Sequence, residues 1–157
     1  MYKKILAPLD GSGMAECVLD HVKAIAAGCG VPEVVLLRVV EPVSSFDIGE
    51  LAASNPKVAT QVEQQEEEQH RNTAKQYVDE MANKLKMEGV AANAEIITGK
   101  AAEGILSYAQ NNQIDLIVMS THGRSGISRW AFGSVADKII RHSLIPVLIV
   151  APTGCRI

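Results

Sequence analysis

Five short runs of apolar residues recur along the chain, and stretches with helical periodicity separate them. The runs are continuous rather than alternating, which is typical of parallel strands whose two faces are both covered. The third run is the weakest of the five. The runs therefore predict five parallel strands, at residues 5–9, 34–40, 90–97, 116–119 and 146–150.

The stretches between the runs predict four helices. In the first, apolar residues from Ala15 to Ala26 recur at a spacing of three and four and form one buried stripe, and Gly28 with Gly30 ends the helix. The second helix is long, with a polar first half and an apolar stripe in its second half. The helices begin near residues 12, 56, 100 and 135, and the last three end near residues 88, 111 and 142.

Strands that alternate with helices indicate a doubly wound sheet, because neighbouring parallel strands need crossover connections. We therefore predict an α/β fold, in which an open sheet of five parallel strands is flanked by four helices. A length of 157 residues suits one domain. We assign residues 1–152 to this domain and residues 153–157 to a C-terminal tail. Residues 41–55 have no periodicity, and connections of that length are often functional.

Composition excludes several classes of partner. The chain has 15 Lys and Arg against 18 Asp and Glu, a net charge of −3, so it lacks the dense cationic face that nucleic-acid binding needs. No apolar run approaches the length of a membrane span. The three cysteines (Cys17, Cys29 and Cys155) are scattered and odd in number. They predict no disulfide framework, and hence a cytoplasmic location.

The glycine-rich stretch from Ser120 to Ser134 follows the fourth predicted strand, and ligands of open parallel sheets bind beyond the carboxyl ends of the strands. It has neither the Lys-Ser/Thr pair of a Walker A loop nor the three closely spaced glycines of a dinucleotide fingerprint. Gly133 and Ser134 stand at a helix start, where free N–H groups and a partial positive charge attract anions. Alternatively, Ser134 and Asp137 form a capping box at the end of a long turn.

Asp10 follows the first predicted strand directly and has two interpretations. Its carboxylate can accept hydrogen bonds from ribose hydroxyl groups at the sheet edge, or it can cap the helix that begins near Ser12. The sequence alone leaves both open.

Three features resemble the universal stress protein family, and the resemblance covers nearly the whole chain. The first strand ends in ILAPLDGS, the second ends in LLRVVEP, and the last segment reads IPVLIV after a helix. Between them, Gly123 is followed by nine residues and then by Gly133 and Ser134, which is similar to the family's glycine motif. The first glycine of that motif is replaced by Ser120, whose side chain can crowd a ligand or donate a hydrogen bond to it.

The resemblance implies a site for ATP or another adenine nucleotide. A bound triphosphate normally brings Mg²⁺ that is held largely by water and phosphate oxygens. The four histidines are not paired with cysteines or carboxylates at metal-ligand spacing, so we predict no protein metal site. The resemblance implies that the Val39 backbone meets the adenine, that Asp10 holds the ribose and that Pro8 and Met119 wall the base. The implied phosphate-binding residues are Ser120, Gly123, Gly133, Ser134 and Val135. It also implies a homodimer in which the last strands, residues 146–150, pair antiparallel.

The resulting hypothesis is a stress-response or signalling module that binds an adenine nucleotide without dedicated catalysis. No nucleophile–base constellation is recognisable in the sequence. Two alternatives stay open, which are a slow ATP hydrolase or adenylyl-transfer enzyme and a family member that no longer binds nucleotide. A phosphoacceptor receiver domain is disfavoured, because Asp10 has no acidic neighbour and the third strand ends in Ile97, Thr98 and Gly99.

Overall fold

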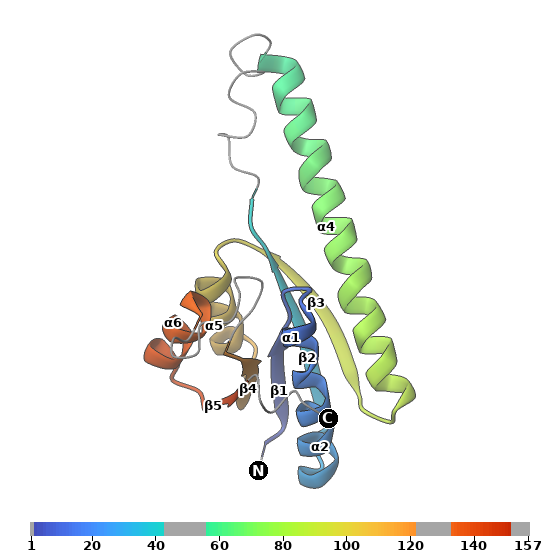
Figure 1. Ribbon diagram of the computed structural model, residues 1–157, viewed down its shortest axis with the longest axis vertical. Helices are drawn as coiled ribbons and strands as arrows, with labels where there is room; N and C mark the ends of the chain where they lie inside the picture. The colour runs from blue at the N-terminus through green and yellow to red at the C-terminus, as the bar shows by residue number, and fades with distance from the viewer. Residues whose placement is uncertain (1, 43–55, 122–132, 152–157) are drawn as a thin grey trace.

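The computed structural model describes residues 2–42, 56–121 and 133–151. Within these ranges, five strands form one sheet in the order β3-β2-β1-β4-β5, and every neighbouring pair is parallel (Figure 1). The predicted fold class is therefore confirmed. The strands are β1 (Lys4–Pro8), β2 (Glu33–Val40), β3 (Ala92–Thr98), β4 (Leu116–Ser120) and β5 (Val147–Val150).

The strand order reverses between β1 and β4. β1 pairs with β2 on one side, from Lys4 opposite Glu33 to Pro8 opposite Leu37, and with β4 on the other side. The chain therefore winds outward from β1 in both directions, and the connections leave β1 and β4 on opposite faces. Such a switch point opens a crevice at the carboxyl ends of the two strands.

Helices cover both faces of the sheet. Helix α2 (Val18–Cys29) and helix α4 (Pro56–Met87) pack on one face, and helix α5 (Ala101–Asn111) and helix α6 (Ser134–His142) pack on the other. The first predicted helix is divided, because a short helix α1 (Gly13–Glu16) precedes α2 and Cys17 joins the two. Ser12 caps α1 by accepting a hydrogen bond from the Ala15 N–H at 3.2 Å.

Two hydrophobic clusters explain why the strands are continuously apolar. Along β1, Ile5 and Ala7 face the cluster under α2 and α4, whereas Leu6 faces the cluster under α5 and α6. All three side chains are fully buried, so neither face of β1 tolerates a polar residue. β2 has the same arrangement, with Leu36 in the first cluster and Leu37 in the second. Burial on both faces is what the sequence pattern predicted.

Helix α4 has two halves of different character. In its second half, Ala74, Val78 and Leu85 are buried against the sheet, which confirms the predicted apolar stripe. Residues 64–73 are exposed, and the first half of the helix extends beyond the edge of the sheet (Figure 1). No helix in the described ranges has the length and apolar character needed to span a membrane.

One predicted strand boundary is wrong, and one cysteine forms a disulfide bond. The third strand begins at Ala92 rather than at Val90, which is buried after the end of α4 instead. Cys29 is a free thiol, whereas Cys17 is disulfide-bonded. One such bond is not a disulfide framework, yet it removes cysteine usage as support for a reducing compartment.

Candidate functional site

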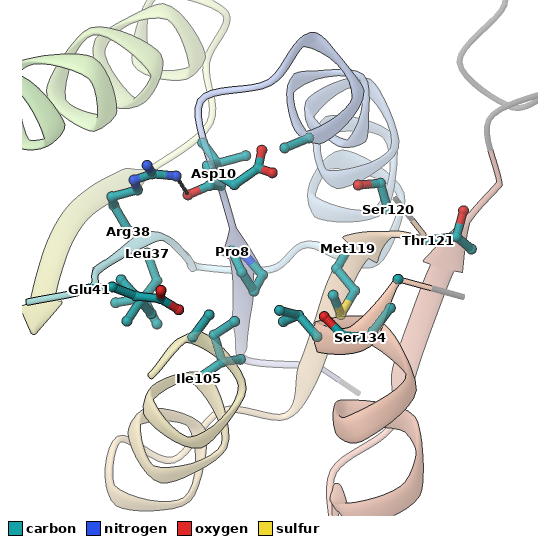
Figure 2. A pocket seen from close by; sticks show the side chains of 17 residues that line it. Pro8, Asp10, Leu37, Arg38, Glu41, Ile105, Met119, Ser120, Thr121 and Ser134 are labelled. Carbon is teal, nitrogen blue, oxygen red and sulfur yellow. Dashed lines mark hydrogen bonds between the residues drawn. The ribbon is translucent and has the colours of Figure 1, made fainter. Parts of the chain in front are cut away.

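A cavity of about 430 Å³ opens at the carboxyl edge of the sheet, where β1, β2 and β4 end near the first turn of α6 (Figure 2). Eight of the nine residues proposed from the sequence line it, and the ninth, Gly123, lies outside the described residues. These eight are Pro8, Asp10, Val39, Met119, Ser120, Gly133, Ser134 and Val135. Elements that are far apart in the sequence thus converge on one site, while the nucleotide-binding role of these residues stays a prediction.

Asp10 is fixed by a tight turn after β1. Its Oδ1 accepts hydrogen bonds from the backbone N–H of Ser12 at 2.9 Å and from the Ser12 hydroxyl group at 2.5 Å. The turn passes through Gly11, whose φ of +82° is a conformation that favours glycine. Because Ser12 is the residue that caps α1, Asp10 supports the cap indirectly while it also lines the cavity.

The first turn of α6 forms the opposite wall. Gly133 is the N-cap residue, with φ −58° and ψ 151°, and its N–H donates a 2.8 Å hydrogen bond to the Thr121 carbonyl. The capping-box interpretation is therefore wrong: Ser134 is the first helical residue, and the Asp137 carboxylate accepts from Arg141 Nε at 2.9 Å. The N–H groups of the first turn have no acceptor within the helix and carry its positive dipole end, so this wall suits an anion.

Helix α5 forms the floor of the cavity, and the sequence did not predict its part. Ala101 and Ile105 line the cavity from below. The helix approaches the sheet closely at Gly104, where an added Cβ would lie 2.9 Å from Ile97 Cδ1 and 3.4 Å from Val39 Cγ1. Glycine at this position therefore lets α5 pack directly under the end of β2, and this packing closes the apolar side of the cavity.

Polar residues other than the nine proposed from the sequence also line the cavity. Arg38 lines it and donates from Nη1 to the Leu9 carbonyl at 3.3 Å, which ties the ends of β1 and β2 together. Figure 2 shows Arg38 and Glu41 on one side, and Thr121 on the other. A charged residue inside the otherwise apolar run LLRVV was the available sequence signal for Arg38.

The lining is divided by chemistry. Pro8, Ile105 and Met119 supply apolar surface toward the middle of the cavity, and Val39 also lines it. Figure 2 shows the Ser134 side chain at the first turn of α6, with Ser120 and Thr121 at the end of β4. The cavity thus offers apolar walls for a flat ring system and donors for an anionic group. Across the described residues, no three His, Cys, Asp or Glu side chains gather closely enough to hold a metal ion.

The chain is similar to known proteins over almost its whole length. Residues 1–151 match the model of the universal stress protein family. The universal stress protein MJ0577 of Methanocaldococcus jannaschii is 34% identical over 155 residues, covering 96% of this chain and 95% of that protein. The solved structure of MJ0577 superimposes with a TM-score of 0.79 and covers 96% of both chains.

Two further solved structures share the fold at lower identity. One is a universal stress protein in complex with cAMP, which is 20% identical with a TM-score of 0.64 and covers 96% of this chain and 97% of its own. The other is a universal stress protein family protein from Arabidopsis thaliana with AMP bound, which is 16% identical with a TM-score of 0.63. It covers 95% of this chain and 91% of its own.

Proposed function

Because the chain belongs to the universal stress protein family, we propose that it is a cytoplasmic stress-response or signalling module that binds an adenine nucleotide, ATP in the first instance. The observation that carries the proposal is the cavity at the strand-order switch point, with apolar walls at its middle and the first turn of a helix at one side. Crevices of this kind are where open α/β sheets bind ligands.

Each part of the nucleotide has a suitable group in the cavity. Pro8 and Met119 would flank the base beside the Val39 backbone, and the Asp10 carboxylate would accept hydrogen bonds from the ribose hydroxyl groups. The N–H groups of Ser134 and Val135 would donate to phosphate oxygens, since the first turn of a helix favours negative charge. Mg²⁺ would be held mainly by water and phosphate oxygens.

Nucleotides bound to two structural relatives support the choice of ligand. The relatives solved with cAMP and with AMP have the same fold as this chain, and both ligands contain adenine, ribose and phosphate. A cavity that accepts these three parts is consistent with ATP, ADP, AMP and cAMP. Their relative affinities are therefore part of the test.

The proposal includes a homodimer through β5. This strand is at the edge of the sheet, and Leu148 on it is 39% exposed, while Leu144 just before it is 86% exposed. An apolar edge strand exposes unpaired backbone groups that promote association with another strand. Antiparallel pairing with the β5 strand of a second copy would cover both the backbone edge and these leucines.

Calorimetric titration with ATP, ADP, AMP and cAMP, together with a turnover assay with Mg-ATP, tests the proposal. We expect saturable binding and turnover well below about 1 s⁻¹, the lower end of the ordinary enzyme range. Faster turnover would favour the alternative of a hydrolase or adenylyl-transfer enzyme. No binding at about 1 mM ligand, where a free energy of only about −4.1 kcal/mol is detectable, would favour a family member that no longer binds nucleotide.

A further inference from the structure

Behind the wall of the cavity lies a hydroxyl group without a partner. Tyr77 is on the second half of α4, and its half-buried ring packs against the hydrophobic cluster that contains Leu9 and Ala15. Its Oη is the single buried side-chain oxygen or nitrogen in the described part of the chain that makes no hydrogen bond. A buried hydroxyl without a partner is unfavourable, and native proteins keep few such groups.

The surroundings of this hydroxyl group are ionic. Burial raises the pKa of Tyr77 above its ordinary value of 10.0, the carboxylates of Glu16 and Asp10 raise it further, and the Arg38 guanidinium opposes them. The hydroxyl group is therefore a permanent donor near two carboxylates. The Glu16 carboxylate is at the limit of hydrogen bonding with the Tyr77 hydroxyl group and helps to raise the Tyr77 pKa, although the two groups do not reach the geometry of a fully formed hydrogen bond.

Two of these three charged groups also line the cavity. Asp10 and Arg38 face the space on the other side of the wall, and Ala15, the neighbour of Glu16 on α1, lines it as well. Tyr77 itself does not line the cavity, so it can influence a ligand only through these residues. The Tyr77 hydroxyl group thus lies behind the part of the cavity wall that contains Asp10 and would hold the ribose.

We propose that Tyr77 is a positioning residue for the ribose side of the cavity. When a nucleotide binds, the Tyr77 hydroxyl group donates a hydrogen bond to the Asp10 carboxylate and holds Asp10 in the orientation that accepts ribose hydroxyl groups. This inference rests on the proposed nucleotide-binding function. Because the hydrogen bond forms only in the bound state, it contributes to affinity and contributes nothing to the stability of the ligand-free protein.

The variant Tyr77→Phe tests whether the hydroxyl group contributes to affinity and not to ligand-free stability, since it removes one oxygen and keeps the ring. Without ligand, we expect unchanged or higher resistance to urea unfolding, because no hydrogen bond is lost. Affinity for ATP measured by calorimetry should fall about tenfold, the effect of one hydrogen bond to a charged acceptor. A purely structural tyrosine would instead lower stability. Equal ATP affinity in the wild type and the variant would overturn the inference.

Two controls identify the route of the effect. Tyr108→Phe makes the same change at a half-buried tyrosine of α5 that lies in the other hydrophobic cluster and outside the cavity lining, and it should leave ATP affinity unchanged. With 2′,3′-dideoxy-ATP, which lacks both ribose hydroxyl groups, Tyr77→Phe should cost nothing, and an undiminished tenfold loss would contradict a role through Asp10. If the wild type binds no nucleotide, the proposed function fails and the inference falls with it. If only the variant comparison fails, the proposed function stands.

Discussion

Gly133→Val places a branched side chain at the N-cap of α6, on the wall that would hold the phosphates. The backbone there tolerates the change, because φ −58° and ψ 151° lie in the extended region that valine adopts readily. The hydrogen bond from the residue-133 N–H to the Thr121 carbonyl also stays possible, since it uses only the backbone. We therefore expect a folded protein with an altered site.

The effect on stability is small because two contributions offset each other. An apolar residue is a poorer N-cap than glycine by about 1 kcal/mol. Replacing a glycine at a compatible backbone conformation stabilises a protein by about 0.4–1 kcal/mol through the unfolded chain. The free energy of unfolding should therefore change by less than about 1 kcal/mol, against a typical total of about 5–15 kcal/mol.

The effect on binding is large. A hydrogen bond to a charged group contributes about 1.5–3 kcal/mol, so losing the contacts of the Ser134 and Val135 N–H groups costs about 3–6 kcal/mol. ATP affinity should therefore fall at least about 100-fold by calorimetry. Gly28→Val is the matched control, because Gly28 is exposed on α2 with nothing within 4 Å of an added Cβ. Unchanged ATP affinity in a folded Gly133→Val protein would refute the reasoning about α6.

Three other substitutions test separate parts of the account. Asp115 Oδ2 accepts the N–H groups of Lys3 and Lys4 at 2.7 and 2.9 Å, which lowers the Asp115 pKa below 3.8 in the folded state. The ionised Asp115 carboxylate therefore stabilises the wild type at neutral pH, and this contribution is lost as pH falls through the lowered pKa. Asp115→Asn should be less stable than the wild type to urea at neutral pH, and the two urea unfolding curves should converge in acid. Leu148→Asp should give a monomer by light scattering at micromolar concentration where the wild type is a dimer, and a monomeric wild type would contradict pairing through β5. Ser120→Gly should preserve or strengthen ATP binding if the side chain only crowds the ligand, whereas weaker binding would mean that the hydroxyl group contributes.

Much of the fold was predictable because each strand is buried on both faces. Residues such as Ile5 and Leu6 face opposite clusters and are both fully buried, which leaves a continuous apolar run in the sequence. β3 was predicted less well, since it is an edge strand with exposed positions such as Asn93 and Glu95, and its start was misplaced by two residues. A partly exposed edge strand lacks the continuous apolar run that marks a buried strand in the sequence.

The parts that the sequence did not predict depend on contacts between distant segments. The Gly133 N–H donates a hydrogen bond to the Thr121 carbonyl, and this contact helps to make Gly133 rather than Ser134 the N-cap. Local sequence propensity does not encode such a contact. Arg38 reaches the Leu9 carbonyl across 29 positions of the chain. Tyr77 packs on the apolar face of its helix, and a periodic apolar pattern gives no sign that its hydroxyl group lies near Glu16 and the cavity.

The central claim is that the cavity holds a nucleotide with its phosphates at the first turn of α6. Backbone amide NMR of the protein titrated in parallel with Mg-ATP and with adenosine tests this claim directly. The account predicts that both ligands shift the signals of Asp10 and Val39, and that only ATP strongly shifts those of Ser134 and Val135. Equal shifts of Ser134 and Val135 with adenosine, or ATP-induced shifts confined to residues outside the cavity, would contradict it.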